Sequence, residues 1–270
     1  MIPCIWCDDD ARAAADLYVA AFPDSRITSE SPFMVGFELA GRPLLAMNGG
    51  PKYRPNPRLS LFGFFGSEEE VNGAHALLVE GGSELTPLGA YPWSPRYAWI
   101  EDRFGVSWQL IVRGEGDDVD AVVPCLMFTG ETFGRAREAM ERYAGIFPDS
   151  GPGSITANTD GTVLHGRFRM NGADAIAMDS GESHAFDFTE GMSLFVFADP
   201  QAEIDRYWDA LIADGGEESR CGWLKDPYGV SWQIIPSVLP ALMEDPERAP
   251  RVVEAFLPMT RFDIDDILSA

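Results

Sequence analysis

The chain has 270 residues, of which 46% are hydrophobic, and a formal net charge of −23 at pH 7. This length and apolar content suffice for two ordinary domains, each with a core of its own. The negative charge argues against nucleic acid or an anionic membrane as a partner, because both would repel it. The first residues lack a basic segment followed by an apolar run, and no apolar stretch approaches a membrane span, so we expect a cytoplasmic protein.

The first elements follow the order β-α-β-β-β. An apolar segment at residues 3–7 predicts a strand, and the acidic residues 8–10 after it suit the N-terminus of a helix. Ala13, Leu17 and Ala21 form the apolar face of that helix, which ends before Pro23. Three short strands are then predicted near residues 26–30, 33–39 and 42–47.

The same order of elements starts again at residue 59. Residues 59–65 are apolar and typical of a strand, Ser67-x-x-Glu70 is a capping box that opens a helix, and Gly81-Gly82 stops it. A loop rich in proline and glycine is predicted at residues 86–95, before strands at 96–101 and 106–112.

A polar linker, residues 114–120, separates these elements from a second set. There the sequence predicts a strand at 125–128, a helix at 133–146, and strands at 166–170 and 173–178. Asp199 as N-cap and Pro200 as the first helical residue predict a further helix that ends at Gly215-Gly216. In the tail we expect a helix from Asp245-Pro246 to Leu257 and a last turn at residues 262–268.

One phrase occurs twice in the chain and shows how these elements are organised. Residues 104–111 read FGVSWQLI and residues 228–235 read YGVSWQII, 124 positions later, and Phe-Pro-Asp-Ser at 22–25 returns at 147–150. We therefore predict two copies of one α+β domain, at residues 1–115 and 120–236, with four βαβββ units in total, and a helical tail at residues 237–270. The duplication predicts an internal pseudo-dimer and leaves a homodimer open as well.

The four cysteines do not indicate a disulfide framework. Cys4 and Cys7 form a C-x-x-C pair, but the segment is typical of a strand, in which positions i and i+3 point to opposite faces. No second C-x-x-C follows, so we do not expect redox chemistry or a zinc site.

The paired βαβββ units, with helices that end in Phe-Pro-Asp-Ser and strands that read Gly-Val-Ser-Trp-Gln, resemble the vicinal oxygen chelate superfamily of glyoxalases, bleomycin-resistance proteins and extradiol dioxygenases. The chain is most similar to its PhnB-like branch, often labelled 3-demethylubiquinone-9 3-methyltransferase-like. The matching motifs include Gly222-Trp-Leu-Lys-Asp226 and the tail from Met259 to Leu268. The resemblance spans both copies and implies curved mixed sheets that form cups for a metal or a small ligand.

Metal-using members of this superfamily bind the ion through His and Glu, and the resemblance locates those positions here. The Glu position on the last strand is Gln109 in the first copy and Gln233 in the second. The first-strand positions fall at residues 3–4 and 124–125, and those of the other unit at 58–60 and 191–193, none with a histidine. A neutral carboxamide is a poor substitute for a carboxylate at a divalent cation, so we expect no metal cofactor.

A methyltransferase function finds no support in the sequence. Enzymes that use adenosylmethionine commonly need a glycine-rich loop between a strand and a helix. Gly49-Gly50 follows a strand but leads into Pro51, and the pairs at 81–82 and 215–216 follow helices. No nucleophile motif is present either, and the sequence identifies no catalytic residue.

Strand alternation indicates which side chains face the cups. If Gln109 and Gln233 point inward, Ser107 and Ser231 share that face, whereas Trp108 and Trp232 point under the helices into the core. Trp99 and Trp223 are ambiguous, and a core role is an equal alternative for the other candidates. The predicted ligand-binding residues are Gln109, Gln233, Ser107, Ser231, Trp6, Phe128, Met47, Asn48, Met178, Asp179, Trp99 and Trp223.

These features favour a metal-free protein that binds an apolar or planar small molecule in a cup. The alternative is an enzyme of the lyase, isomerase or dioxygenase type. It would use a metal held by unusual ligands such as Asp179, Cys4 or His165, or acid/base chemistry with a cup carboxylate. A purely structural or interaction protein is the third hypothesis.

Overall fold

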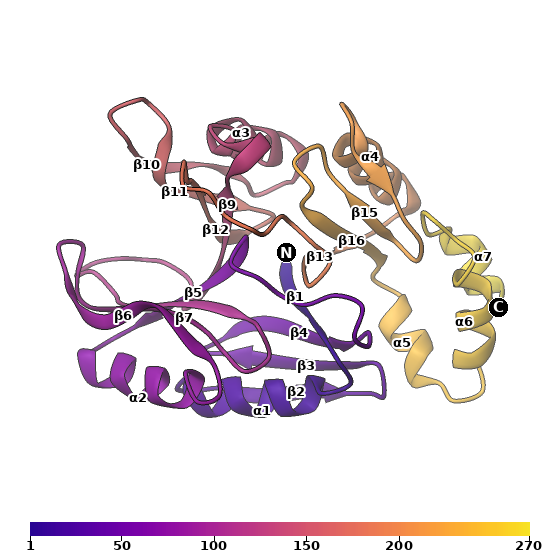
Figure 1. Cartoon of the computed structure of the whole chain (residues 1–270). Coiled ribbons are helices and arrows are strands. Elements are labelled where there is room, and N and C mark those ends of the chain that lie inside the picture. The colour runs from indigo at the N-terminus through magenta and orange to yellow at the C-terminus, as the bar shows by residue number, and fades with distance from the viewer. The chain divides into compact units, whose positions relative to one another are not determined.

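Four consecutive βαβββ units and a helical tail make up the chain, as the sequence predicts (Figure 1). The computed structural model describes residues 1–270. It divides into a larger compact unit, Pro3–Met192, and a smaller one, Met1–Ile2 with Ser193–Ala270. The predicted limits of the two sequence copies stay a prediction, because compactness in space and repetition in sequence are different properties.

The first copy contributes two of the βαβββ units. Their elements are β1 (Ile2–Cys7), α1 (Ala11–Ala21), β2 (Arg26–Glu30), β3 (Met34–Leu39), β4 (Arg42–Asn48), β5 (Leu59–Phe65), α2 (Glu68–Leu78), β6 (Ser83–Tyr91), β7 (Ser94–Glu101) and β8 (Ser107–Val112).

The second copy contributes the other two units, and the tail adds three helices. Their elements are β9 (Val122–Phe128), the 3-10 turn η1 (Gly130–Thr132), α3 (Ala136–Ile146), β10 (Gly151–Ala157), β11 (Val163–Met170), β12 (Ala173–Asp179), β13 (Met192–Ala198), α4 (Gln201–Ile212), β14 (Glu217–Glu218), β15 (Trp223–Lys225), β16 (Ser231–Pro236), α5 (Leu239–Glu244), α6 (Ala249–Phe256) and α7 (Ile264–Ser269).

An eight-stranded mixed sheet in the larger unit joins the two copies. Its order is β10-β11-β12-β9-β5-β8-β7-β6. The central strands β5 and β9 are antiparallel, with Leu61 opposite Pro124, while β5 pairs with β8 and β12 with β9 in parallel. One half of the sheet therefore comes from each copy, and Figure 1 shows both halves with β6 and β10 at the outer edges.

The remaining strands pair as follows within each unit. In the larger unit β1, β4, β3 and β2 lie in that order, with β1 and β4 parallel and the other pairs antiparallel. In the smaller unit β13 and β16 are parallel, and β15 pairs with β16 and β14 in antiparallel fashion.

The strand β8 shows how alternation separates the core from the concave face. Trp108 is fully buried, and its ring lies 5.1 Å from that of Tyr18 and 5.3 Å from that of Phe22 on and beside α1. Gln109 points to the opposite side of the sheet. The prediction that Trp108 packs under the helices is confirmed. Close packing also explains Gly63 in β5, because a Cβ there would lie 2.9 Å from the Phe22 ring.

A repeated loop explains the recurrent phrase in structural terms. The carboxylate of Asp102 accepts hydrogen bonds from the backbone of Phe104 (2.8 Å) and Val106 (3.0 Å) and from Trp108 Nε1 (3.0 Å). In the second copy Asp226 accepts the equivalent three bonds, at 2.9, 3.0 and 2.9 Å. The repeated sequence thus forms the same aspartate-centred loop in both copies, directly before the last strand of each.

The structure differs from the predicted elements at several points. Residues 86–95, predicted as a loop, contain most of β6, which tolerates Pro87 because it is an edge strand with several register shifts. The strand β10 was not predicted. The N-cap of α4 is Pro200 rather than Asp199, because Pro200 has an extended backbone. In the tail, α5 was not predicted, and the next helix begins only at Ala249 because residues 245–248 form a turn.

None of the helices combines the length and the apolar character that crossing a membrane requires.

Candidate ligand pocket

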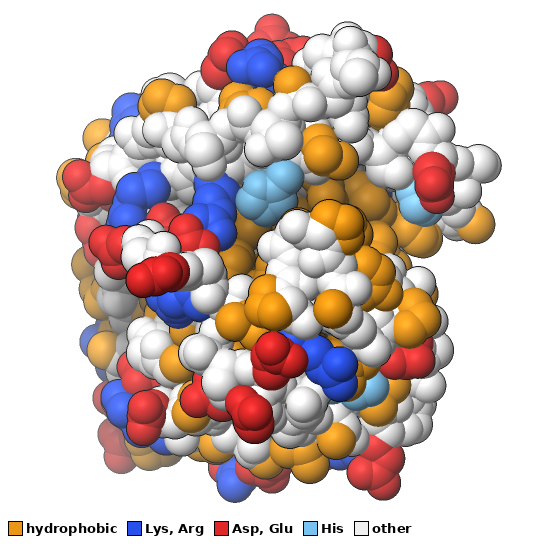
Figure 2. Space-filling view, turned by 90° about the vertical axis from the view of Figure 1, so that its left-hand side faces the viewer, with side chains coloured by type: hydrophobic (Ala, Val, Ile, Leu, Met, Phe, Trp, Pro, Cys, Tyr) orange, Lys and Arg blue, Asp and Glu red, His pale blue; other side chains and the backbone are white.

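A cavity of about 720 Å³ lies on the eight-stranded sheet of the larger unit. Both copies line it, because β5, β7 and β8 come from the first and β10, β11 and β12 from the second. Figure 2 shows, near the middle of this face, hydrophobic side chains gathered in a hollow beside a histidine and basic side chains. The lining residues are Phe62, Phe64, Trp93, Pro95, Tyr97, Gln109, Ile111, Val112, Arg113, Gly114, Glu115, Asp117, Thr156, Leu164, His165, Arg167 and Met178.

The floor of the cavity is aromatic and aliphatic. Phe62 and Phe64 lie two residues apart on β5 and so point to one face, with ring centroids 5.7 Å apart in a stacked arrangement. They belong to a buried cluster against which Ile111 of β8 and Met178 of β12 pack. The floor thus presents flat hydrophobic surface contributed by three strands.

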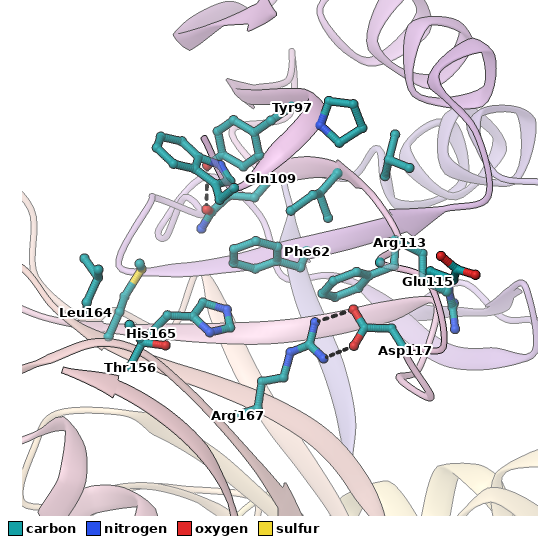
Figure 3. A pocket seen from close by; sticks show the side chains of 17 residues that line it. Phe62, Tyr97, Gln109, Arg113, Glu115, Asp117, Thr156, Leu164, His165 and Arg167 are labelled. Atoms are coloured by element: carbon teal, nitrogen blue, oxygen red, sulfur yellow. Dashed lines mark hydrogen bonds and ion pairs between the residues drawn. The ribbon is translucent and has the colours of Figure 1, made fainter. Parts of the chain in front are cut away.

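A hydrogen-bonded chain crosses one wall. The Tyr97 hydroxyl donates to Gln109 Oε1 at 2.7 Å (Figure 3). Gln109 Nε2 in turn donates to Ser60 Oγ at 3.0 Å. Burial raises the pKa of Tyr97 above its ordinary value, so the hydroxyl stays protonated. Because its hydrogen is engaged with Gln109, Tyr97 offers the cavity only acceptor lone pairs.

The positions at which metal-using relatives carry their ligands do converge here, but with the wrong chemistry. Ser60 lies directly opposite Cys125 in the β5–β9 ladder, and Gln109 bonds to Ser60. The amide oxygen of Gln109 is occupied by Tyr97, and burial raises the pKa of the Cys125 thiol to about 12. A hydroxyl, a protonated thiol and an engaged carboxamide do not fit a divalent cation. The structure contains no group of three or more His, Cys, Asp or Glu residues that could hold one.

An ion pair borders the cavity at its charged end. Arg167 of β11 donates Nη1 to Asp117 Oδ1 at 2.9 Å and Nη2 to Oδ2 at 3.1 Å, which joins the linker to the strand (Figure 3). The guanidinium also lies 5.3 Å from the ring centroid of Phe64. The hydrogen bonds from Arg167 lower the pKa of Asp117 below its ordinary value, so this carboxylate is ionised at neutral pH.

His165 and Arg167 are two residues apart on β11 and line the same cavity. The His165 ring meets Phe62 edge to face, with centroids 6.0 Å apart. Burial and the nearby Arg167 charge lower the pKa of His165 below 6.5. The imidazole is therefore neutral at pH 7 and adds no positive charge to the cavity.

Of the residues predicted to bind a ligand, the structure brings Gln109 and Met178 to the cavity. Trp99 packs behind it against the buried cluster, and its Nε1 donates to the fully buried Ser107 at 2.7 Å. Phe128 is fully buried beside Phe188. None of these three residues lines the cavity.

Asn48 and Asp179, which end equivalent strands in the two copies, hold helices instead. Asn48 Oδ1 accepts a hydrogen bond from the backbone of Ala11 at the start of α1. Asp179 accepts bonds from the backbone of Gly134 and Ala136 at the start of α3 and from Val163 at the start of β11. Both therefore anchor helix N-termini.

None of the other candidates is among the residues that line this cavity. Trp6 donates Nε1 to Gly50 O at 2.7 Å, and Met47 lies at the end of β4. In the smaller unit Gln233 donates Nε2 to Ser193 Oγ at 2.9 Å, Ser231 is buried and Trp223 begins β15. A role in ligand binding stays a prediction for every one of these candidates.

Sequence reasoning missed most of the cavity wall. Phe62 and Phe64 could have been found, because they share a face with Ser60 on a strand that was predicted. Asp117, Glu115 and Arg167 could not, because a linker and a distant strand meet only in the fold. The linker, residues 114–120, was predicted only to separate the copies.

The chain is similar to a known protein family. A family model described as 3-demethylubiquinone-9 3-methyltransferase matches residues 1–111 and again residues 120–235. The chain belongs to this family. The two matches confirm the tandem repeat and the PhnB-like resemblance. No curated protein matches the chain.

The chain is also similar to solved structures. A putative 3-demethylubiquinone-9 3-methyltransferase, PhnB protein, from Bacillus cereus is 26% identical over 42% of this chain and 98% of that chain, with a TM-score of 0.40. Glyoxalase I from Zea mays is 12% identical over 90% of this chain and 95% of that chain, with a TM-score of 0.60. The second likeness shows the duplicated vicinal oxygen chelate fold.

The family description names a methyltransferase. The glycine-containing segments of this chain show whether a binding loop for adenosylmethionine is present. After β4, Gly49-Gly50 leads to β5 without an intervening helix, and a Cβ at Gly49 would clash with the Trp6 ring at 2.2 Å. The glycines at 81–82 and 215–216 follow α2 and α4. These segments do not fit a glycine-rich loop that opens a helix at a nucleotide cofactor.

Proposed function

We propose that this PhnB-like protein binds a small apolar or planar molecule, without a metal ion, in the cavity of its eight-stranded sheet. The observation that carries the proposal is the aromatic floor of a cavity of about 720 Å³. A volume of this order is typical of sites that enclose most of a drug-sized ligand.

The polar atoms on the wall support binding rather than metal chemistry. Gln109 is held between Tyr97 and Ser60, so its amide is fixed and needs no ion to satisfy it. The flat faces of Phe62 and Phe64 can stack on a planar ligand and remove its apolar surface from water.

The enzyme alternative has no comparable observation in its favour. Asp179 is engaged by three backbone N–H groups, and Cys4 is buried within β1, whereas His165 lines the cavity. Asp117 is a carboxylate at the cavity, but Arg167 keeps its pKa low, which makes it a weak base at neutral pH. We also expect a cytoplasmic protein with no nucleic acid or membrane partner.

Ligand binding can be tested with a cavity-filling variant. Met178 lies half-buried in the cavity floor, so Met178→Trp should occupy the space that a ligand needs. Leu77→Trp adds the same side chain at an exposed position of α2 outside the cavity and is the matched control. Circular dichroism verifies that both variants fold.

Thermal-shift screening of planar apolar compounds, followed by calorimetry, provides the measurement. We expect at least one compound to bind the wild type with a Kd of about 100 μM or tighter. Met178→Trp should weaken that binding at least about tenfold and Leu77→Trp should not. A screen without any binder, or equal binding to Met178→Trp, would refute the proposal.

A further inference from the structure

The two ends of the cavity differ in the hydrogen bonds that they offer. Figure 3 shows Tyr97 and Gln109 at one end, Phe62 in the middle, and Arg113 and Asp117 at the other end. Tyr97 presents an acceptor there, whereas the arginines present donors only. A ligand that fills the whole cavity must therefore match an apolar floor and a donor-rich end.

Arg113 has further N–H donors available at the charged end of the cavity. Its Nη1 donates to Val119 O at 2.6 Å, which uses one of the five N–H groups of a guanidinium. Arg167 uses two of its own on Asp117. Both arginines line the cavity, so their remaining N–H groups are the donors that it offers to a ligand with acceptor lone pairs.

The contact with Asp117 shows that Arg167 binds a carboxylate. Its carboxylate binds the guanidinium through two parallel hydrogen bonds, the geometry in which arginine recognises carboxylates. The bound group comes from the linker rather than from a ligand. Arg113 directly precedes this linker, just after β8, and no ion pair engages it.

The formal charge of −23 does not prevent an anion from binding here. Charges farther away than about 8 Å are largely screened at physiological ionic strength, so the nearest groups dominate. The charged groups that line the cavity are Arg113 and Arg167, which are positive, and Asp117 and Glu115, which are negative. His165 is neutral and leaves this local balance unchanged.

We propose that the ligand is a flat aromatic carboxylate, whose rings lie on Phe62 and Phe64 and whose carboxylate takes the free N–H groups of Arg113 and Arg167. This inference rests on the proposed function and narrows it to one chemical class. A hydroxyl or amine on the far side of the ring would find the acceptor of Tyr97.

A matched pair of probes tests the charge requirement. 2-Naphthoate and 2-naphthamide share the same flat rings and differ in the carboxylate, and calorimetry gives the affinity of each. Wild-type protein should bind naphthoate about tenfold or more tightly than naphthamide, because hydrogen bonds from a guanidinium to a carboxylate are charge-assisted.

Two variants locate the source of the preference. Arg113→Gln should bring the two affinities within about threefold of each other, since it removes the fork of donors. Arg169→Gln is the control, because Arg169 lies on the same strand as Arg167 but outside the cavity. The ratio of the two affinities is insensitive to a modest loss of folded protein.

The outcomes separate this inference from the proposed function. If naphthamide binds wild type as tightly as naphthoate, or if Arg113→Gln keeps the wild-type ratio, the carboxylate class is wrong and a planar-ligand site remains. If neither probe binds but uncharged planar compounds do, the result is the same. If no planar compound binds at all, both proposals fail.

Discussion

The second unit of each copy, β5–β8 and β13–β16, shares one design but not one outcome. Both have a serine on the first strand that accepts a hydrogen bond from a glutamine on the last, at 3.0 Å for Ser60 and Gln109 and 2.9 Å for Ser193 and Gln233. Both also have the aspartate loop before the last strand. The shared part is the framework of the sheet.

The difference lies in the hairpin between helix and last strand. Trp99 follows Ser60 by 39 positions, whereas Trp223 follows Ser193 by only 30. The long hairpin, β6 and β7, contributes Trp93 and Tyr97 to the cavity. In the smaller unit β14 and β15 have two and three residues.

The C-terminal tail takes the place beside this short hairpin. Cys221 N donates to Met259 O at 2.8 Å and Gly222 N to Thr260 O at 2.9 Å. Phe262 packs so closely that a Cβ on Gly222 would lie 2.5 Å from its ring. The long hairpin therefore forms a wall of the cavity, whereas the tail packs against the equivalent region of the smaller unit.

The largest expected effect is on stability, and it distinguishes the packed tail from the hairpin that forms the cavity wall. Phe262→Ala should lower the free energy of unfolding by about 3 to 5 kcal/mol, because Phe262 is 2% exposed and a cavity would remain. Trp93→Ala should cost no more than about 1 kcal/mol, because Trp93 is 61% exposed and loses mainly its contacts with Tyr91 and Tyr97. Urea denaturation measures both.

A different result would change the comparison itself. If Trp93→Ala is as destabilising as Phe262→Ala, the long hairpin is part of the core rather than a wall of the cavity. Binding of planar compounds to Trp93→Ala provides the second measurement, and it should weaken even though the fold is kept.

The aspartate loops should give the next largest effect, and an equal one. Asp102→Ala and Asp226→Ala each leave three N–H groups without their acceptor in buried surroundings, which should cost about 2 to 4 kcal/mol. Asp118→Ala in the exposed linker is the control and should change stability little. A large cost for only one of the two loops would show that the shared framework is not equally important in both copies.

The pH dependence of Asp102 should give the smallest effect. Burial raises its pKa from 3.8 to about 6, although its hydrogen bonds oppose the shift. Between these two values the folded state binds more protons than the unfolded state, so the contribution of Asp102 to stability is lost as pH rises. Relative to Asp102→Asn, the wild type should therefore lose stability between about pH 4 and pH 7.

Denaturation of both proteins across this range measures the difference. A constant difference between wild type and Asp102→Asn would contradict the raised pKa. Asp226→Asn, measured in the same way, then shows whether the second loop titrates alike.

Features set by local rules could be predicted from the sequence. The inward direction of Gln109 and the burial of Trp108 follow from strand alternation, and the capping box of α2 is formed by Ser67, which accepts a hydrogen bond from Glu70 N. Repetition then extended the same assignments to the second copy. The vicinal oxygen chelate fold and the PhnB-like family followed from these motifs.

Features that depend on distant partners could not be predicted. Asn48 and Asp179 were candidates for the cup, but their helix N-termini come close only when the strands are assembled. The ion pair of Asp117 with Arg167 joins residues 50 positions apart. Edge strands such as β6 are equally hidden, because their register shifts and proline resemble a loop.

The two halves of the sheet that meet at β5 and β9 belong to one polypeptide, and this affects how the protein can evolve. Two separate, identical chains would carry every substitution at both equivalent sheets, so a change that suited one would also be imposed on the other. Because the halves are fused in one polypeptide, a mutation touches one place only. A long hairpin and a shortened one can then coexist, so that one half keeps a cavity while tail packing fills the equivalent region of the other.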